Sequence, residues 1–130
     1  MLNVETYVSD SIFHGLGLFA KNDIQQGEII WTYNQKIDHS YTIKEWNDLK
    51  ETLSSPSFKT LQNFAYKERD KYFICSDNAQ YMNHHAHDYN VKNSKDLNTM
   101  YALRNISKDE ELLYNYFESS DKDDFHLKFL

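Results

Sequence analysis

The chain contains very few residues that allow a sharp turn. Its 130 residues include three glycines and one proline, against ten tyrosines and eight phenylalanines. Because glycine reaches positive φ without steric cost, the positions of so few glycines are informative. Gly15 and Gly17 lie two apart, and Gly27 follows a polar turn. The sequence therefore predicts an aromatic-rich fold with special backbone geometry near its N-terminus.

Length and composition restrict the class of protein. A chain of this length without a Pro-, Ser- or Gly-rich linker fits one domain, 1–130. The net charge of -6 argues against direct nucleic-acid binding and favours a basic partner. Cys75 is the only cysteine, so the fold has no internal disulfide, and its apolar surroundings indicate a packed residue.

The sequence also predicts where the protein resides. No apolar stretch reaches the ~18 residues of a membrane span, and Met1–Asp10 lacks the charge and apolar pattern of a signal peptide. We expect a cytoplasmic protein without membrane contact, and export by a signal-independent route stays open.

Hydrophobic periodicity predicts short strands and two helices. Thr42 and Glu45 form a capping box before one helix, and Pro56 suits the first turn of a second. We expect a charged turn at Lys67–Lys71 and a tail that docks through Phe125 and Phe129. The expected strands are Ile12–Ala20 and Glu28–Tyr33, as an N-terminal hairpin or meander, then Tyr72–Cys75, and Thr99–Asn105 with Glu111–Phe117 as an antiparallel pair.

Three segments contain residues suited to chemistry. Gly15-Leu16-Gly17 could bring main-chain groups against a cofactor, although a simple tight turn explains it equally well. Tyr81–Asn90 holds three of the six histidines, which suggests either metal ligands or a surface loop. Ala102–Tyr116 carries Tyr114 and Tyr116 on one strand face, as core aromatics or as site residues.

Taken in order, these segments resemble the SET-domain protein lysine methyltransferases, over about residues 12–117. Gly15-Leu16-Gly17-Leu18-Phe19-Ala20 and Ile24–Ile30 are similar to the family's opening Gly-x-Gly-(Leu/Val)-Phe-Ala motif and Ile-x-x-Gly-Glu turn. Asn83-His84 falls at its Asn-His motif, closed by Asn90. Ala102–Tyr116 resembles Ala-x-Arg-x-Ile-x-x-Gly-Glu-Glu-Leu-x-x-Asp-Tyr. The small size is similar to minimal stand-alone SET proteins of bacteria and large viruses.

The resemblance implies a mainly β fold with two short inserted helices: a SET-type (β-clip) fold of small curved sheets with a C-terminal pseudoknot. It implies a core at 12–117, a helical insert at about 42–66 that shapes a peptide groove, and a tail at 118–130.

The resemblance further implies methyl transfer from S-adenosylmethionine to a lysine of a basic protein or histone-like tail, with monomethylation as the main product because of Tyr114. Tyr116 would be the catalytic tyrosine, with Tyr33 and Tyr114 lining the lysine channel. The backbone at Leu16 and Gly17, the Asn83 side chain and the His84 main chain would bind the cofactor, covered by Phe117 or another tail aromatic. No metal is implied, and a homodimer stays open.

Four positions depart from the family pattern. His85 stands for serine, Tyr89 for proline, Asp109 for the turn glycine and Asn115 for the acidic residue. Asp109 suits a left-handed turn. These departures leave two alternatives open: a SET fold that binds without turnover, and a histidine-dependent metal protein.

Overall fold

The structure is a computed structural model that describes all residues, 1–130. It is mainly β, with two α-helices inserted together, as the sequence predicts. The helices are α1 (Ile43–Thr52) and α2 (Ser55–Phe64), with 3₁₀ turns η1 (Asn78–Tyr81), η2 (Tyr116–Glu118) and η3 (Phe125–Phe129). The strands are β1 (Thr6–Asp10), β2 (Leu16–Ala20), β3 (Ile29–Thr32), β4 (Asp38–Thr42), β5 (Tyr66–Glu68), β6 (Lys71–Cys75), β7 (Asn83–His84), β8 (Val91–Asn93), β9 (Thr99–Ala102) and β10 (Leu113–Tyr114).

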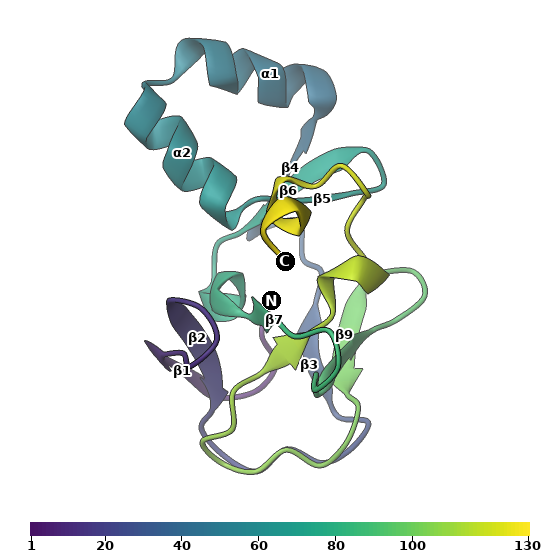
Figure 1. The fold of residues 1–130 in the computed structure, drawn as a ribbon. Coiled ribbons are helices and arrows are strands. Elements are labelled where there is room, and N and C mark those ends of the chain that lie inside the picture. Colours follow the sequence, from purple (N-terminus) through teal and green to yellow (C-terminus); the bar gives the residue numbers. More distant parts are fainter.

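The strands form four small sheets rather than one large sheet. β1 and β2 make an antiparallel hairpin, while β3-β9-β8 and β4-β6-β5 are three-stranded antiparallel sheets. β7 and β10 form a short parallel pair. Figure 1 shows the two helices at one end of the molecule, beyond the β4-β6-β5 sheet.

Two of the predicted strand pairings are wrong. β2 pairs with β1, which the sequence analysis did not predict, and β3 pairs with β9. The segment after Ser107–Asp109 does not return along β9 either, because β10 pairs with β7 in parallel. β3 and β9, like β7 and β10, lie far apart in the chain, so the local turn residues do not reveal these pairings.

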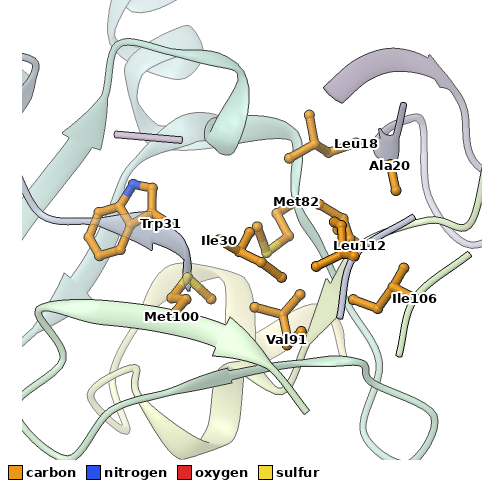
Figure 2. Packing of buried hydrophobic residues seen from close by; sticks show 11 residues of the cluster. Leu18, Ala20, Ile30, Trp31, Met82, Val91, Met100, Ile106 and Leu112 are labelled. Carbon is orange, nitrogen blue, oxygen red and sulfur yellow. The ribbon is translucent and has the colours of Figure 1, made fainter. Parts of the chain in front are cut away.

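The main hydrophobic core lies where β2, β3, β8 and β9 meet. Figure 2 shows Ile30, Met82, Val91 and Leu112 gathered at its centre. Ile30, Val91 and Leu112 are completely buried. Replacing a buried leucine with alanine costs about 2–5 kcal/mol, so this cluster is a principal source of stability.

The helical insert has a second, smaller core. Trp46 stacks on Tyr72 of β6 with ring centroids 4.5 Å apart and packs against Phe58 of α2. The predicted capping box is present: the Glu45 main chain donates to the Thr42 hydroxyl, and the Thr42 main chain donates to the Glu45 carboxylate, both at 3.1 Å. The insert is therefore fixed to the β4-β6-β5 sheet.

The C-terminal tail docks, as predicted, and its anchor is acidic. The Asp121 carboxylate accepts from the main chains of Arg69 and Asp70, in the turn between β5 and β6. The Asp124 carboxylate accepts from the main chain of Lys67 at 2.6 Å. The tail returns over the β4-β6-β5 sheet toward the middle of the molecule (Figure 1).

The predicted charged turn at 67–71 is shorter than expected. Tyr66–Glu68 forms β5, and only Arg69 and Asp70 turn, both with positive φ. None of the helices has the length and apolar character that crossing a membrane requires.

Candidate active site

One large cavity opens between the N-terminal loop, the helical insert and the tail. Its volume is about 730 Å³, within the range of about 300–1,000 Å³ typical of small-molecule and cofactor sites. Most lining residues are hydrophobic. The wall draws residues chiefly from 13–16, 63–68, 79–84, 120–130 and the tyrosines Tyr114 and Tyr116. The fold thus brings the predicted site motifs to one cavity.

Asn83 fixes the loop on one side of the cavity. Its side-chain amide donates to the carbonyl oxygens of His14 at 2.9 Å and Leu16 at 3.1 Å, and lies 3.2 Å from Glu111 Oε2. Asn83 is only 8% exposed, so these hydrogen bonds form largely away from water. The predicted cofactor residue therefore holds the loop that carries Leu16.

The two glycines beside Leu16 have different surroundings. A Cβ on Gly17 would lie 2.8 Å from the carboxylate of Glu111, which also accepts from the Ser11 hydroxyl at 3.0 Å. Gly15 has a φ of +48°, and a Cβ there would meet no atom within 4 Å. Gly17 is thus needed for close packing, whereas Gly15 lets the chain turn at the cavity wall.

Tyr114 and Tyr116 lie together on the cavity wall, although Tyr116 begins η2 rather than continuing a strand. Their ring centroids are 4.6 Å apart. The Tyr116 hydroxyl donates to the carbonyl oxygen of Met82 at 2.9 Å. Burial raises the pKa of both hydroxyls above the ordinary value. Both are therefore neutral and can orient an amine without removing its proton.

His84 links the Asn-His motif to Tyr116, the predicted catalytic tyrosine. Its Nδ1 accepts a hydrogen bond from the main chain of Tyr116 at 3.0 Å. Burial lowers the pKa of His84, and the neighbouring His85 lowers it further. The neutral ring therefore carries its proton on Nε2.

Asn90 holds the segments that the resemblance places in the pseudoknot. Its side-chain amide donates to the Glu111 carbonyl oxygen at 2.8 Å, and its side-chain oxygen accepts from the Leu113 main chain at 2.9 Å. Since Asn90 is almost completely buried, both bonds are sheltered from water. They fix the start of β10 beside the residue that precedes β8.

Three predicted site residues, Gly17, Tyr33 and Phe117, do not line the cavity. Phe117 is 55% exposed and contacts the edge of His84, while Phe125 and Phe129 of the tail are on the wall. Tyr33 packs edge-on against Trp31 and Phe73. Their predicted roles remain untested.

Three residues on the wall were missed by the sequence analysis. Tyr66 lies there, stacked on Phe73 with ring centroids 5.5 Å apart. Glu68 and Asp124 are buried acids on the same wall. Tyr66 could have been predicted as a site residue because it is aromatic. Nothing in the local sequence distinguishes the buried Glu68 from the exposed charged residues that follow it.

Glu68 and Asp124 differ in their partners. Asp124 accepts from the Lys67 and His126 main chains, one through each oxygen, at 2.6 and 2.8 Å. Glu68 is 8% exposed, accepts no main-chain hydrogen bond and forms no ion pair. Burial raises the pKa of Glu68 to about 7, although the nearby Arg69 guanidinium and the hydrogen bond with the Ser119 hydroxyl lower it.

The departures from the family pattern have local partners. His85 Nδ1 accepts from the main chains of His87 at 3.2 Å and Asp88 at 2.7 Å, so the imidazole closes its own turn. The Asn115 side chain accepts from the Phe117 main chain at 3.1 Å and caps η2. Both side chains, His85 and Asn115, therefore form hydrogen bonds with main-chain groups of their own segments.

The other two departures are also accommodated. The Tyr89 hydroxyl donates to the Glu118 carboxylate at 2.8 Å. Asp109 adopts a φ of +72°, in the left-handed region that the sequence analysis expects it to tolerate. The structure brings together no group of three or more His, Cys, Asp or Glu side chains suited to a metal ion. Cys75 is buried as predicted, and its thiol donates to Asp77.

The residues of the cavity fit the cofactor that the resemblance implies. Leu16 is 48% exposed at the wall and Phe13 beside it is also exposed, which leaves apolar surface for an adenosine to cover. Beside them, Gly15 faces open space. The loop 13–16 and the Asn83–His84 segment would hold such a cofactor.

Comparisons with known proteins agree with this geometry. The SET domain family profile matches residues 15–117. A proposed histone methyltransferase of Plasmodium falciparum has a TM-score of 0.57 at 22% identity, over 88% of this chain and 95% of that chain. The comparison with curated proteins finds no match.

Polycomb Repressive Complex 2 of Chaetomium thermophilum is also similar in fold. Its autoinhibited form bound to S-adenosylmethionine has a TM-score of 0.66 at 19% identity, over 92% of this chain and 16% of that chain. A second crystal structure of the complex gives 0.64 at 20% identity, with the same shares covered. The fold is the one that SET-domain proteins share. Because the profile matches most of its length, the chain belongs to the SET-domain family.

Proposed function

We propose that this chain is an S-adenosylmethionine-dependent protein lysine N-methyltransferase. The observation that carries the proposal is the shared cavity: the Tyr114–Tyr116 pair lines the same space as the Asn83-bound loop 13–16. One side suits a cofactor and the other suits an amine. Apolar walls between them keep water from the reaction.

The residues present account for the steps that a protein must perform in methyl transfer. The cofactor, when bound, supplies an electrophilic methyl group on a sulfonium. The neutral Tyr116 hydroxyl and the Met82 carbonyl group beside it can orient the amine lone pair. A free lysine has a pKa of about 10.4, so the desolvated channel must also favour its neutral form.

We propose a lysine-rich peptide as the substrate, such as a histone-like tail. The chain carries 20 acidic against 14 basic residues, which steers a basic peptide toward it. The proposal includes a homodimer, in which a second copy of the chain completes the peptide groove.

We propose monomethylation as the main product, because of Tyr114. Its hydroxyl lies on the cavity wall and forms no hydrogen bond within the chain, so it occupies space that a methylated amine needs. Phenylalanine at this position removes the hydroxyl and enlarges the pocket.

A methylation assay with labelled methyl donor and a histone H3 tail peptide tests this function, with products separated by mass. The wild type should give mainly monomethyl-lysine, and Tyr114→Phe should shift the product toward dimethyl- and trimethyl-lysine. Tyr101→Phe is the matched control, because Tyr101 lies on β9 outside the cavity. Wild-type trimethylation that Tyr114→Phe leaves unchanged would contradict the assignment. Cofactor binding without methyl transfer would support the binding-module alternative.

A further inference from the structure

Glu68 is the buried acid on the cavity wall that has neither an ion pair nor a main-chain hydrogen bond. It ends β5, is 8% exposed, and faces the same space as Tyr114 and Tyr116. Its carboxylate accepts no main-chain hydrogen bond and forms no ion pair, and the group beside it is the buried Ser119 hydroxyl, a neutral donor that lowers its pKa. Burial of an acid without a charged partner costs stability, so its position in a cleft indicates a functional role.

Most other ionisable groups on the wall cannot receive a proton from a ligand. Both oxygens of Asp124 accept main-chain hydrogen bonds. Nδ1 of His84 is occupied by the Tyr116 main chain, which places the ring proton on Nε2. The Cys75 thiol and the hydroxyls of Tyr66, Tyr114 and Tyr116 are protonated, because burial raises each pKa. Apart from Tyr81, the exposed His14 and the half-buried His126, this leaves Glu68.

We propose that the Glu68 carboxylate accepts the proton of the substrate lysine ammonium before methyl transfer, an inference that rests on the proposed function. One ammonium N–H bond breaks and one carboxyl O–H bond forms, which leaves a neutral amine and a neutral carboxylic acid. The amine then forms its N–C bond as the S–C bond breaks, with the S–C electrons staying on sulfur. The proton on Glu68 returns to solvent after the product leaves.

The surroundings of Glu68 suit this transfer. Burial raises its pKa to about 7, Arg69 in the adjoining turn and the hydrogen bond with the Ser119 hydroxyl lower it, and Asp121 and Asp124 of the tail raise it. Tyr66 and Tyr114 also face it, and both hydroxyls are neutral. A free lysine and a free glutamate differ by about 6 pKa units, which is a large barrier to transfer. The raised pKa of Glu68 reduces that gap by about 2 to 3 units.

Glu68→Gln tests the inference because glutamine keeps the shape but cannot take the proton. With a histone H3 tail peptide at pH 7, we expect kcat to fall about 10²-fold or more with little change in KM. The wild-type kcat should rise with pH and level off above an inflection near 7. In Glu68→Gln that inflection should be absent, with kcat still rising toward the pKa of lysine.

Two further variants complete the test. Glu51→Gln changes an exposed glutamate of α1 and is the matched control. His126→Gln removes the competing base, and loss of the inflection in His126→Gln but not in Glu68→Gln would overturn the inference. A kcat for Glu68→Gln close to that of the wild type would do the same. Circular dichroism confirms that each variant is folded.

Titration of the Glu68 carboxyl carbon by NMR gives a readout that does not depend on turnover. We expect a midpoint near 7, assigned by the loss of the signal in Glu68→Gln. A midpoint at the ordinary value of about 4.3 would overturn the inference. Calorimetry with S-adenosylmethionine separates the two proposals. Failure of the folded wild type to bind it would remove the proposed function, and this inference with it. Cofactor binding with normal Glu68→Gln turnover would remove only this inference.

Discussion

The two sides of the cavity are built in opposite ways. On the loop side, Asn83, Ser11 and Glu111 form a connected set of hydrogen bonds that leaves few polar groups without a partner. On the β5 side, Glu68 is equally buried, but it accepts no main-chain hydrogen bond and its one side-chain neighbour for hydrogen bonding is the Ser119 hydroxyl. The polar groups of the two sides are similarly buried, and the two sides differ in the number of hydrogen-bond partners that these groups have.

This difference indicates which buried polar residues increase the stability of the fold and which reduce it. A buried polar group with hydrogen bonds contributes to stability, while a buried acid without them reduces it. The loop side therefore acts as a preformed frame for a ligand. The β5 side holds a reactive group in place through the tail that packs on it.

Truncation of the chain after Ser119 should have the largest effect, because it removes the tail from the β5 side. The Asp121 and Asp124 carboxylates together accept from three main-chain N–H groups of residues 67–70. Charge-assisted hydrogen bonds contribute about 1.5–3 kcal/mol each, so stability should fall by about 5 kcal/mol. Urea unfolding measures this loss.

The same truncation should sharply weaken binding of S-adenosylmethionine, because Phe125 and Phe129 leave the cavity wall. Lys122→Ala, an exposed change in the same tail, is the control. Unchanged cofactor affinity in the truncated protein would show that the tail does not cover the site.

Glu68→Gln should stabilise the protein at high pH. The pKa of Glu68 rises from an ordinary 4.5 to about 7 on folding, so ionisation of the folded state is penalised. Below pH 4.5 the acid is neutral in both states and costs nothing. The penalty grows as pH rises through 7 and reaches about 3 kcal/mol at pH 9.

Urea unfolding of wild type and Glu68→Gln at pH 4.5 and pH 9 checks the sign of this effect. The stability difference between the two proteins should be small at the lower pH and favour glutamine at the higher one. The same difference at both values would show that Glu68 is not held in a desolvated, unpaired state.

Tyr116→Phe should slow methyl transfer on an otherwise intact site. The variant loses the hydroxyl that donates to the Met82 carbonyl group, and with it a group that orients the amine. Misplacement of a reacting group costs about 10²-fold in rate, and we expect that loss in single-turnover experiments. An unchanged single-turnover rate would remove Tyr116 from the catalytic role.

Ser11→Ala should have the smallest effect, because it removes from the loop side one partly exposed hydroxyl with mainly neutral main-chain partners, and leaves the Asn83 hydrogen bonds in place. The Ser11 hydroxyl donates to Glu111 and accepts from the Phe13 and His14 main chains. Stability should fall by about 1 kcal/mol, with a modest loss of cofactor affinity. A loss of the size expected for the tail truncation would show that the loop is not a preformed frame.

The sequence predicted those site residues that belong to contiguous motifs. Asn83, His84, Tyr114 and Tyr116 were identified because each motif is short and its spacing is visible in the chain. The fold brings all four to the cavity. The helical insert was equally accessible, since its capping box is local.

The β5 side could not be predicted in the same way. The burial of Glu68 depends on a tail anchored by Asp124, whose bond to the Lys67 main chain spans 57 residues. No local pattern encodes that contact, and the charged residues around Glu68 favour a solvated turn. The pairing of β10 with β7 was missed for the same reason.

Isothermal titration with S-adenosylmethionine, on wild type and Asn83→Ala, tests the central claim most directly. The claim is that the cavity binds the cofactor through a loop that Asn83 holds in place. We expect micromolar binding by the wild type and a loss of at least tenfold in the variant, with both proteins folded. No binding by the folded wild type, or equal binding by both proteins, would contradict it.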